Sequence, residues 1–167
     1  MRTFLLFLLV VAGSVKLNAQ FTWAEVGVDG LTCSACTRSV EMQIRKLDFV
    51  DSVDMNLEHT DGKIYFKKGA AVNIEKIAQA VVDAGFSVRF LQAGFNFSNQ
   101  QVSENSCYTF ENNIYQFLGV DSRTLNGEVT MKFIGKKYLP EKDLSKWKPK
   151  MKSSCGDKSA KVYFVTL

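Results

Sequence analysis

The sequence predicts an α+β protein built in two parts. Residues 21–91 show β-type and helix-type apolar patterns in the order of two strand–helix–strand units. After residue 106 the patterns are almost all of the β type. The chain has 167 residues, which is enough for one ordinary domain or two small ones.

The first unit begins with an alternating apolar run that predicts a strand over 22–28. Val40, Ile44 and Leu47 then recur at helical spacing, so a helix is expected over 34–47. A second strand is expected over 50–57 and a third over 63–66. Between them, the Asp61-Gly62 pair predicts the hairpin turn.

The second unit begins at Asn73, which has the side chain of a helix N-cap. The helix that follows has an apolar stripe, and Gly85 stands where a C-cap is expected. A fourth strand is predicted over 87–91. The order βαββαβ is the split βαβ, or ferredoxin-like, arrangement, in which both helices cover one face of an antiparallel sheet. The stripe consists of Ile74, Ile77, Ala78, Val81 and Val82.

The rest of the chain is predicted to be a linker over 93–105 and a small, mostly β domain over 106–167. The linker is rich in Gln, Asn, Ser and Gly. In the second domain, alternation predicts strands over 128–134 and 161–167, and Asn126-Gly127 predicts a tight turn. A short helix is expected around 143–148. The expected architecture is a small barrel or sandwich, with an OB-like barrel as one arrangement.

Residues 1–19 have the pattern of a secretory signal peptide. Arg2 precedes an apolar run over 4–12, and a cleavage site follows at Ala19. The run is too short to span a bilayer. The mature chain is therefore expected to start at Gln20, to be periplasmic or secreted, and not to insert stably in a membrane.

The four cysteines form one close pair and one distant pair. Export permits disulfides, and the economical pairing joins Cys107 to Cys155, leaving Cys33 and Cys36 for chemistry. Four cysteines allow three pairings, and the sequence leaves all three open.

Cys33 and Cys36 stand where a loop passes into a helix. Their sulfurs can converge on one ion, and the backbone N–H groups and dipole of the helix favour the thiolate form. Thiolates are the ligands preferred by soft ions such as Cu(I) and Zn(II).

The segment Gly30-Leu31-Thr32-Cys33-Ser34-Ala35-Cys36 resembles the heavy-metal-associated domain family of copper chaperones, metal-pumping ATPase domains and periplasmic mercury-binding proteins. The resemblance covers about residues 21–91. It implies that Cys33 and Cys36 are metal ligands, so residues 30–36 are called the metal loop. It also implies that Phe86 lies near the metal loop and that Leu31, where the family usually has Met, packs beneath it. It also implies a protein that is not an enzyme. Such a protein would bind one soft ion for sequestration or transfer to a partner such as a metal-transporting ATPase. Cu(I) is the first expectation, with Hg(II) or Zn(II) as alternatives.

Two other functions stay open. A CxxC pair at a helix N-terminus also fits a thiol–disulfide oxidoreductase, although Thr32 replaces the usual aromatic residue before the first cysteine. Alternatively, the β-rich domain carries a non-catalytic interaction function.

Two further features have plain interpretations. His59, the only histidine, is expected in a solvated turn far from the metal loop. Residues 132–161 contain ten lysines and three acidic residues, and a solvated lysine face is expected there. A docking surface for an acidic partner or an anionic membrane is the alternative. Export and a net charge of +4 argue against nucleic acid as a partner.

Overall fold

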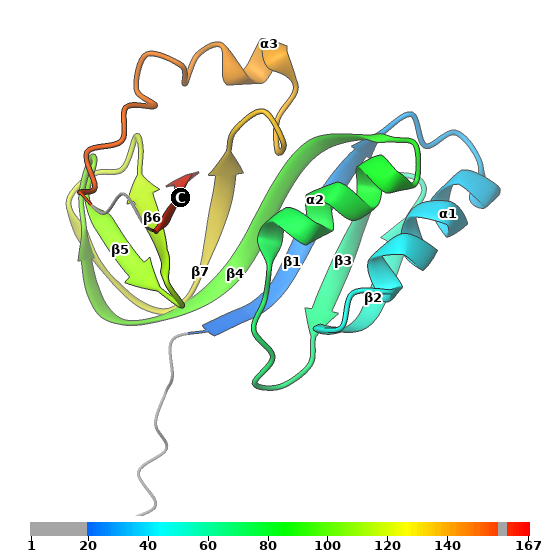
Figure 1. Ribbon diagram of the computed structural model, residues 1–167, viewed down its shortest axis with the longest axis horizontal. Helices are drawn as coiled ribbons and strands as arrows, with labels where there is room; N and C mark the ends of the chain where they lie inside the picture. Colours follow the sequence, from blue (N-terminus) through cyan, green and yellow to red (C-terminus); the bar gives the residue numbers. More distant parts are fainter. Residues whose placement is uncertain (1–19, 157–159) are drawn as a thin grey trace, which may run out of the picture.

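The computed structural model describes residues 20–156 and 160–167. In these ranges it contains eight strands and three helices (Figure 1). They are, in chain order, β1 (Gln20–Asp29), α1 (Ser34–Arg45), β2 (Val50–Asn56), β3 (Asp61–Phe66), α2 (Ile74–Asp83), β4 (Ser87–Val102), β5 (Cys107–Phe110), β6 (Asn113–Phe117), β7 (Arg123–Ile134), α3 (Glu141–Leu144) and β8 (Lys161–Thr166).

All eight strands join one sheet in the order β2-β3-β1-β4-β7-β8-β6-β5. The first four strands with α1 and α2 make the predicted βαββαβ order, and both helices lie on the same face of the sheet (Figure 1). The structure is therefore of mixed α and β type, with a ferredoxin-like first half.

Local signals in the sequence explain where α2 begins and ends. Asn73 Oδ1 accepts the backbone N–H of Lys76 at 3.2 Å and caps the N-terminus. Gly85 follows the C-terminus at φ +88, where a residue with a Cβ is strained. The predicted apolar stripe of α2 is buried except for Val82, which is 54% exposed.

The expected linker over 93–105 is wrong for residues 93–102, which form the second part of β4. This strand is 16 residues long rather than the five predicted over 87–91. It pairs antiparallel with β1 on one side and with β7 on the other. Phe95 and Phe97 are completely buried, so the polar residues around them occupy the outer positions of an alternating strand.

The second half extends this sheet instead of forming a separate OB-like barrel, which is not confirmed. Strands β7, β8, β6 and β5 follow β4 in order, and they curl so that β5 approaches β4 (Figure 1). The ring of Phe110 in β5 lies 4.9 Å from that of Phe95 in β4, edge to face. Phe21 in β1 lies 4.9 Å from Phe95 as well. Aromatic packing therefore joins both halves in one core.

Two predicted tight turns lie inside strands. Asp61-Gly62 belongs to β3, and the hairpin turn is formed by the preceding residues 57–60, with Thr60 at φ 52. Asn126-Gly127 belongs to β7, where Gly127 has φ +77 opposite a bulge in β4. A bulge bends its strand, which contributes to the curl of the sheet.

The predicted signal peptide, residues 1–19, lies outside the described residues. Within the described part of the chain, none of the helices is long and apolar enough to cross a membrane.

The shared core predicts that both halves unfold together. Truncating Phe95 to Ala should lower the free energy of unfolding by about 3–5 kcal/mol, because it leaves a cavity between the aromatic rings. The two tryptophans report on the two halves, so each single-tryptophan variant, Trp23→Phe or Trp147→Phe, follows the unfolding of one half. We expect the two variants to share one urea midpoint, and to share a lower midpoint when both also carry Phe95→Ala. Tyr65→Ala, at an exposed site, is the control. Two separate midpoints would contradict a shared core.

Candidate metal-binding site

Cys33 and Cys36 lie next to each other where β1 passes into α1. Cys33 is the N-cap of α1, with an extended backbone, and its Sγ accepts the backbone N–H of Cys36 at 3.3 Å. The Cα atoms are 5.3 Å apart, and the two sulfurs are joined as a disulfide. Cys33 is exposed and Cys36 is half-buried. The structure thus brings the two predicted ligands together at the surface, in their oxidised form.

The loop is held by backbone geometry and by two apolar contacts. Gly30 has φ +89, a conformation that L side chains rarely adopt. A Cβ at Gly30 would lie 3.6 Å from the ring of Phe86, so this ring borders the loop as the resemblance implies. Leu31 is buried in the core beneath the loop. The loop before the two cysteines is therefore held in one conformation by Gly30, Phe86 and Leu31.

His59 lies at the same end of the sheet as this loop, so its expected position far from the loop is wrong. The hairpin turn lies beside the end of β1, where Val28 N–H donates to Thr60 O at 2.8 Å. The guanidinium of Arg89 donates to His59 O at 2.7 Å and lies 3.9 Å from Asp29 Oδ1. As expected, the His59 side chain is exposed.

Arg89 is the residue at this end that sequence analysis missed. It stands at the start of β4 and also donates to Thr60 Oγ1 at 3.1 Å. It therefore links β4, the hairpin turn and the start of the metal loop. A charged residue inside the otherwise apolar run 88–91 was the available sign of such a role.

Asp61 lies beside the same turn, and burial raises the pKa of its carboxyl above the usual range. The neighbouring Glu25 raises the pKa further, while His59 and Arg89 act in the opposite direction. Negative charge is therefore disfavoured at this point of the sheet.

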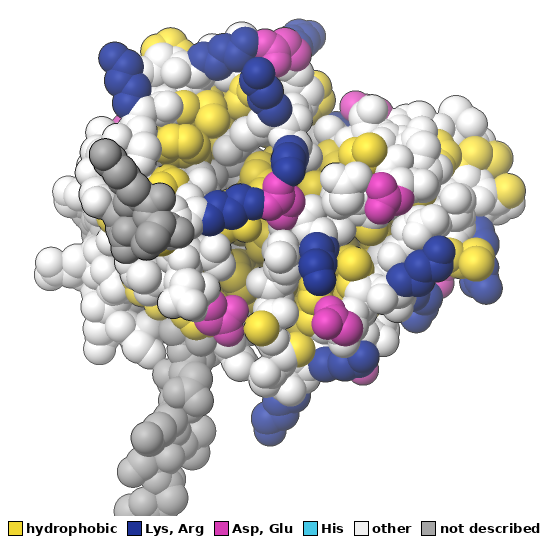
Figure 2. Space-filling model, in the orientation of Figure 1, with side chains coloured by type: hydrophobic (Ala, Val, Ile, Leu, Met, Phe, Trp, Pro, Cys, Tyr) yellow, Lys and Arg dark blue, Asp and Glu magenta, His cyan; other side chains and the backbone are white. Residues whose placement is uncertain are grey.

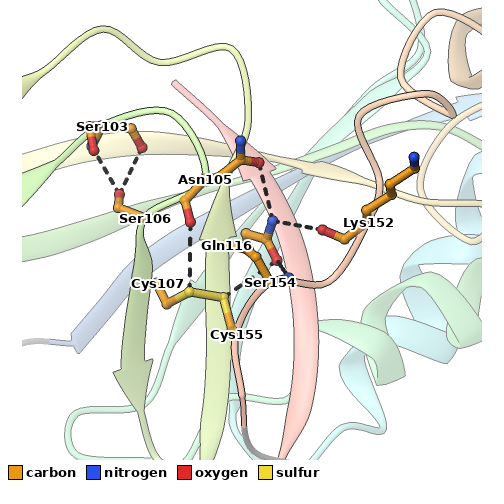
Figure 3. The surroundings of a disulfide bond; sticks show 8 residues. All are labelled: Ser103, Asn105, Ser106, Cys107, Gln116, Lys152, Ser154 and Cys155. Atoms are coloured by element: carbon orange, nitrogen blue, oxygen red, sulfur yellow. Dashed lines mark hydrogen bonds between the residues drawn. A yellow bond between two sulfur atoms is a disulfide. The ribbon is translucent and has the colours of Figure 1, made fainter.

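Cys107 and Cys155 form the second disulfide, with Cα atoms 6.0 Å apart (Figure 3). Beside it, Gln116 is completely buried on β6. Its Nε2 donates to Lys152 O at 3.0 Å, and its Oε1 accepts the N–H of Ser154 at 3.1 Å. Sequence analysis missed Gln116, although a lone polar residue in the apolar run 114–118 was a sign of it. The bridge and Gln116 both hold residues 152–155 against β5 and β6.

Further donor atoms for a metal are scarce near the loop. Over residues 20–156 and 160–167, no group of three or more His, Cys, Asp or Glu side chains is placed to hold an ion. Met55 packs against Gly62, and Met131 is buried. Met42 on α1 is 52% exposed. The described residues therefore offer a site of two sulfurs.

Comparison with known proteins agrees with this geometry. Residues 25–87 match the heavy-metal-associated domain. The chain is 34% identical over 61 residues to the copper chaperone CopZ of Bacillus subtilis, and the match covers 36% of this chain and 87% of CopZ. The chain belongs to the heavy-metal-associated domain family.

Two other relatives are longer proteins, so the matched region covers a smaller share of each. The mercuric transport protein periplasmic component of Pseudomonas fluorescens is 36% identical over 61 residues, which cover 36% of this chain and 66% of that protein. The copper-transporting ATPase 1 of Rhizobium meliloti is 36% identical over 69 residues, which cover 41% of this chain but 8% of the ATPase. The chain therefore spans only a small part of the ATPase, and these three matches each cover less than half of this chain.

The raised pKa of Asp61 predicts how stability depends on pH. An acid whose pKa is higher in the folded state costs stability when it is ionised, and this cost disappears as the pH falls below the range of an unfolded Asp, about 4. Asp61→Asn should therefore raise the melting temperature at pH 7, and the gain should vanish towards pH 3. Thermal unfolding followed by circular dichroism measures this. Asp51→Asn, which removes an exposed carboxylate from β2, is the control. A lower melting temperature for Asp61→Asn at pH 7 would show that attraction to Arg89 outweighs burial.

Proposed function

We propose that this protein, once the Cys33–Cys36 pair is reduced, binds one soft metal ion for sequestration or transfer. The observation that carries the proposal is the position of the two sulfurs side by side at the N-terminus of α1, where Cys33 is exposed and Cys36 is half-buried. Membership of the heavy-metal-associated domain family and the copper chaperone CopZ among its relatives support it.

The number of sulfurs favours Cu(I) as the ion. A disulfide offers no thiolate, so a dithiol reductant must first supply two electrons and two protons to give two thiols, which release their protons and bind the ion as thiolates. Soft ions such as Cu(I) prefer thiolates, whereas a structural zinc site needs four protein ligands. Hg(II), suggested by the mercuric relative, is the next choice, and Zn(II) follows.

The difference in exposure suggests how the ion is passed on. Cys33 is exposed and Cys36 is half-buried, so an incoming thiolate would replace Cys33 first and Cys36 second. A metal-transporting ATPase is the partner that the ATPase relatives suggest. The exchange would take place in the periplasm or outside the cell if residues 1–19 act as the predicted signal peptide.

A second candidate function is thiol–disulfide exchange. The observation that favours it is the disulfide between Cys33 and Cys36 at a helix N-terminus. A helix N-terminus stabilises a thiolate, and a stabilised thiolate is a good leaving group. Thr32 stands where the redox motif usually has an aromatic residue, and the copper chaperone CopZ is among the relatives, so this function is the weaker candidate.

Metal titration tests the main proposal. The reduced protein, freed of reductant under argon, should take up one Cu(I) from its bicinchoninate complex, as followed by absorbance and by native mass spectrometry. Cys33→Ser/Cys36→Ser should remove this uptake. Cys107→Ser/Cys155→Ser is the matched control and should keep it. Uptake that survives in the first double variant but not in the second would place the ion at the other cysteine pair and contradict the proposal.

An insulin reduction assay tests the alternative function. With dithiothreitol as reductant, we expect the protein to leave the rate of insulin precipitation unchanged, because a metal carrier has no need to attack protein disulfides. An acceleration that disappears in Cys33→Ser/Cys36→Ser would assign a redox enzyme instead. Thioredoxin serves as the positive control.

A further inference from the structure

A cleft opens where the two halves of the sheet part. The β4–β7 ladder ends at the pair Gln92–Lys132. Beyond it, Phe90 pairs with β1 while Ile134 pairs with β8. The two strands diverge, and residues of the α3 segment, 139–147, line the space between them. The cleft has a volume of about 700 Å³, within the usual range for sites that bind small molecules.

The cleft combines positive charge with an apolar lining. Three cationic side chains, Arg89, Lys132 and Lys146, line it against one acidic side chain, that of Asp143. Lys and Arg side chains also gather over α3 on the face seen in Figure 2. Cations at the rim of a cleft attract anions.

The lysines of the cleft form no ion pair in the described part of the chain, unlike several other lysines of the second half. Lys137 and Lys161 both pair with Glu75 of α2, and Lys148 pairs with Glu141. Within the described part of the chain, no ion pair involves Lys132 or Lys146. These two charges therefore remain available to a ligand.

Two aromatic side chains supply an apolar surface. Phe90 packs over Gly27, and the indole of Trp147 packs over Gly119; both rings also line the cleft. Trp147 belongs to a small second core with Leu144 and Ile134, so its position is fixed by packing. An apolar body would displace water from these rings.

We propose that the cleft binds a small organic anion. Its carboxylate or phosphate lies between Lys132 and Lys146, and its apolar body lies against Phe90 and Trp147. The cysteine pair does not line this cleft, so the anion site goes beyond the proposed metal function and neither proposal depends on the other.

Binding of the fluorescent probe 8-anilinonaphthalene-1-sulfonate tests the proposal, because the probe joins an aromatic body to one negative charge. We expect saturable binding at one site in the oxidised full-length protein, with displacement by sodium decanoate. Lys132→Glu/Lys146→Glu should weaken binding about tenfold, since two attractive charges become repulsive. Lys136→Glu/Lys142→Glu makes the same change of net charge at exposed lysines outside the cleft, and should leave the affinity within about twofold.

The outcomes separate the proposal from its rivals. Equal weakening by both double variants would indicate attraction by net charge alone and overturn the site. Equal displacement by uncharged decanol would indicate an apolar patch without anion recognition and overturn it as well. In a Trp23→Phe background, decanoate should also change the emission of Trp147, which detects binding without the probe. Far-ultraviolet circular dichroism checks that each variant is folded.

Discussion

The hydrogen bonding of β4 to strands on both of its sides is the constraint on which the structure depends. One strand of 16 residues pairs with β1 of the first half and with β7 of the second. Its start, at Ser87, lies opposite Asp29, where the metal loop begins. Its later part carries Phe95 into the aromatic core. The loop, the core and the cleft are therefore all positioned by the same strand.

The metal loop follows from three local features of the chain. β1 ends at Asp29, Gly30 permits the turn, and Cys33 caps the helix that follows. This arrangement places one sulfur outside the helix and the other in its first turn, close enough for either a disulfide or a shared ion. Because the two states exclude each other, the proposed uptake of metal requires that the disulfide is reduced first.

The sequence predicted the first half well because its signals are local. The Asn73 cap, Gly85 and the helical spacing of α2 depend on neighbours in the chain. The second part of β4 could not be predicted in this way, because Gln, Asn and Ser usually indicate a loop, and its partners are distant strands. The expected position of His59 was wrong for a different reason. The predicted antiparallel βαββαβ order already places the turn before β3 at the end of the sheet where β1 ends, and the expectation for His59 did not follow that order.

Residues 139–147, which follow β7, cover the space between the diverging strands β4 and β7 and so form one side of the cleft. In the segment between β7 and β8, Leu144 packs into the small core near the start, and the bonds from Gln116 to Lys152 and Ser154 hold the later part. The Cys107–Cys155 bridge ties the same part to β5. A segment fixed in this way can cover the diverging strands while its exposed lysines stay in solvent. The second half thus contributes one wall of the cleft, and Arg89 and Phe90 at the start of β4 contribute to the other.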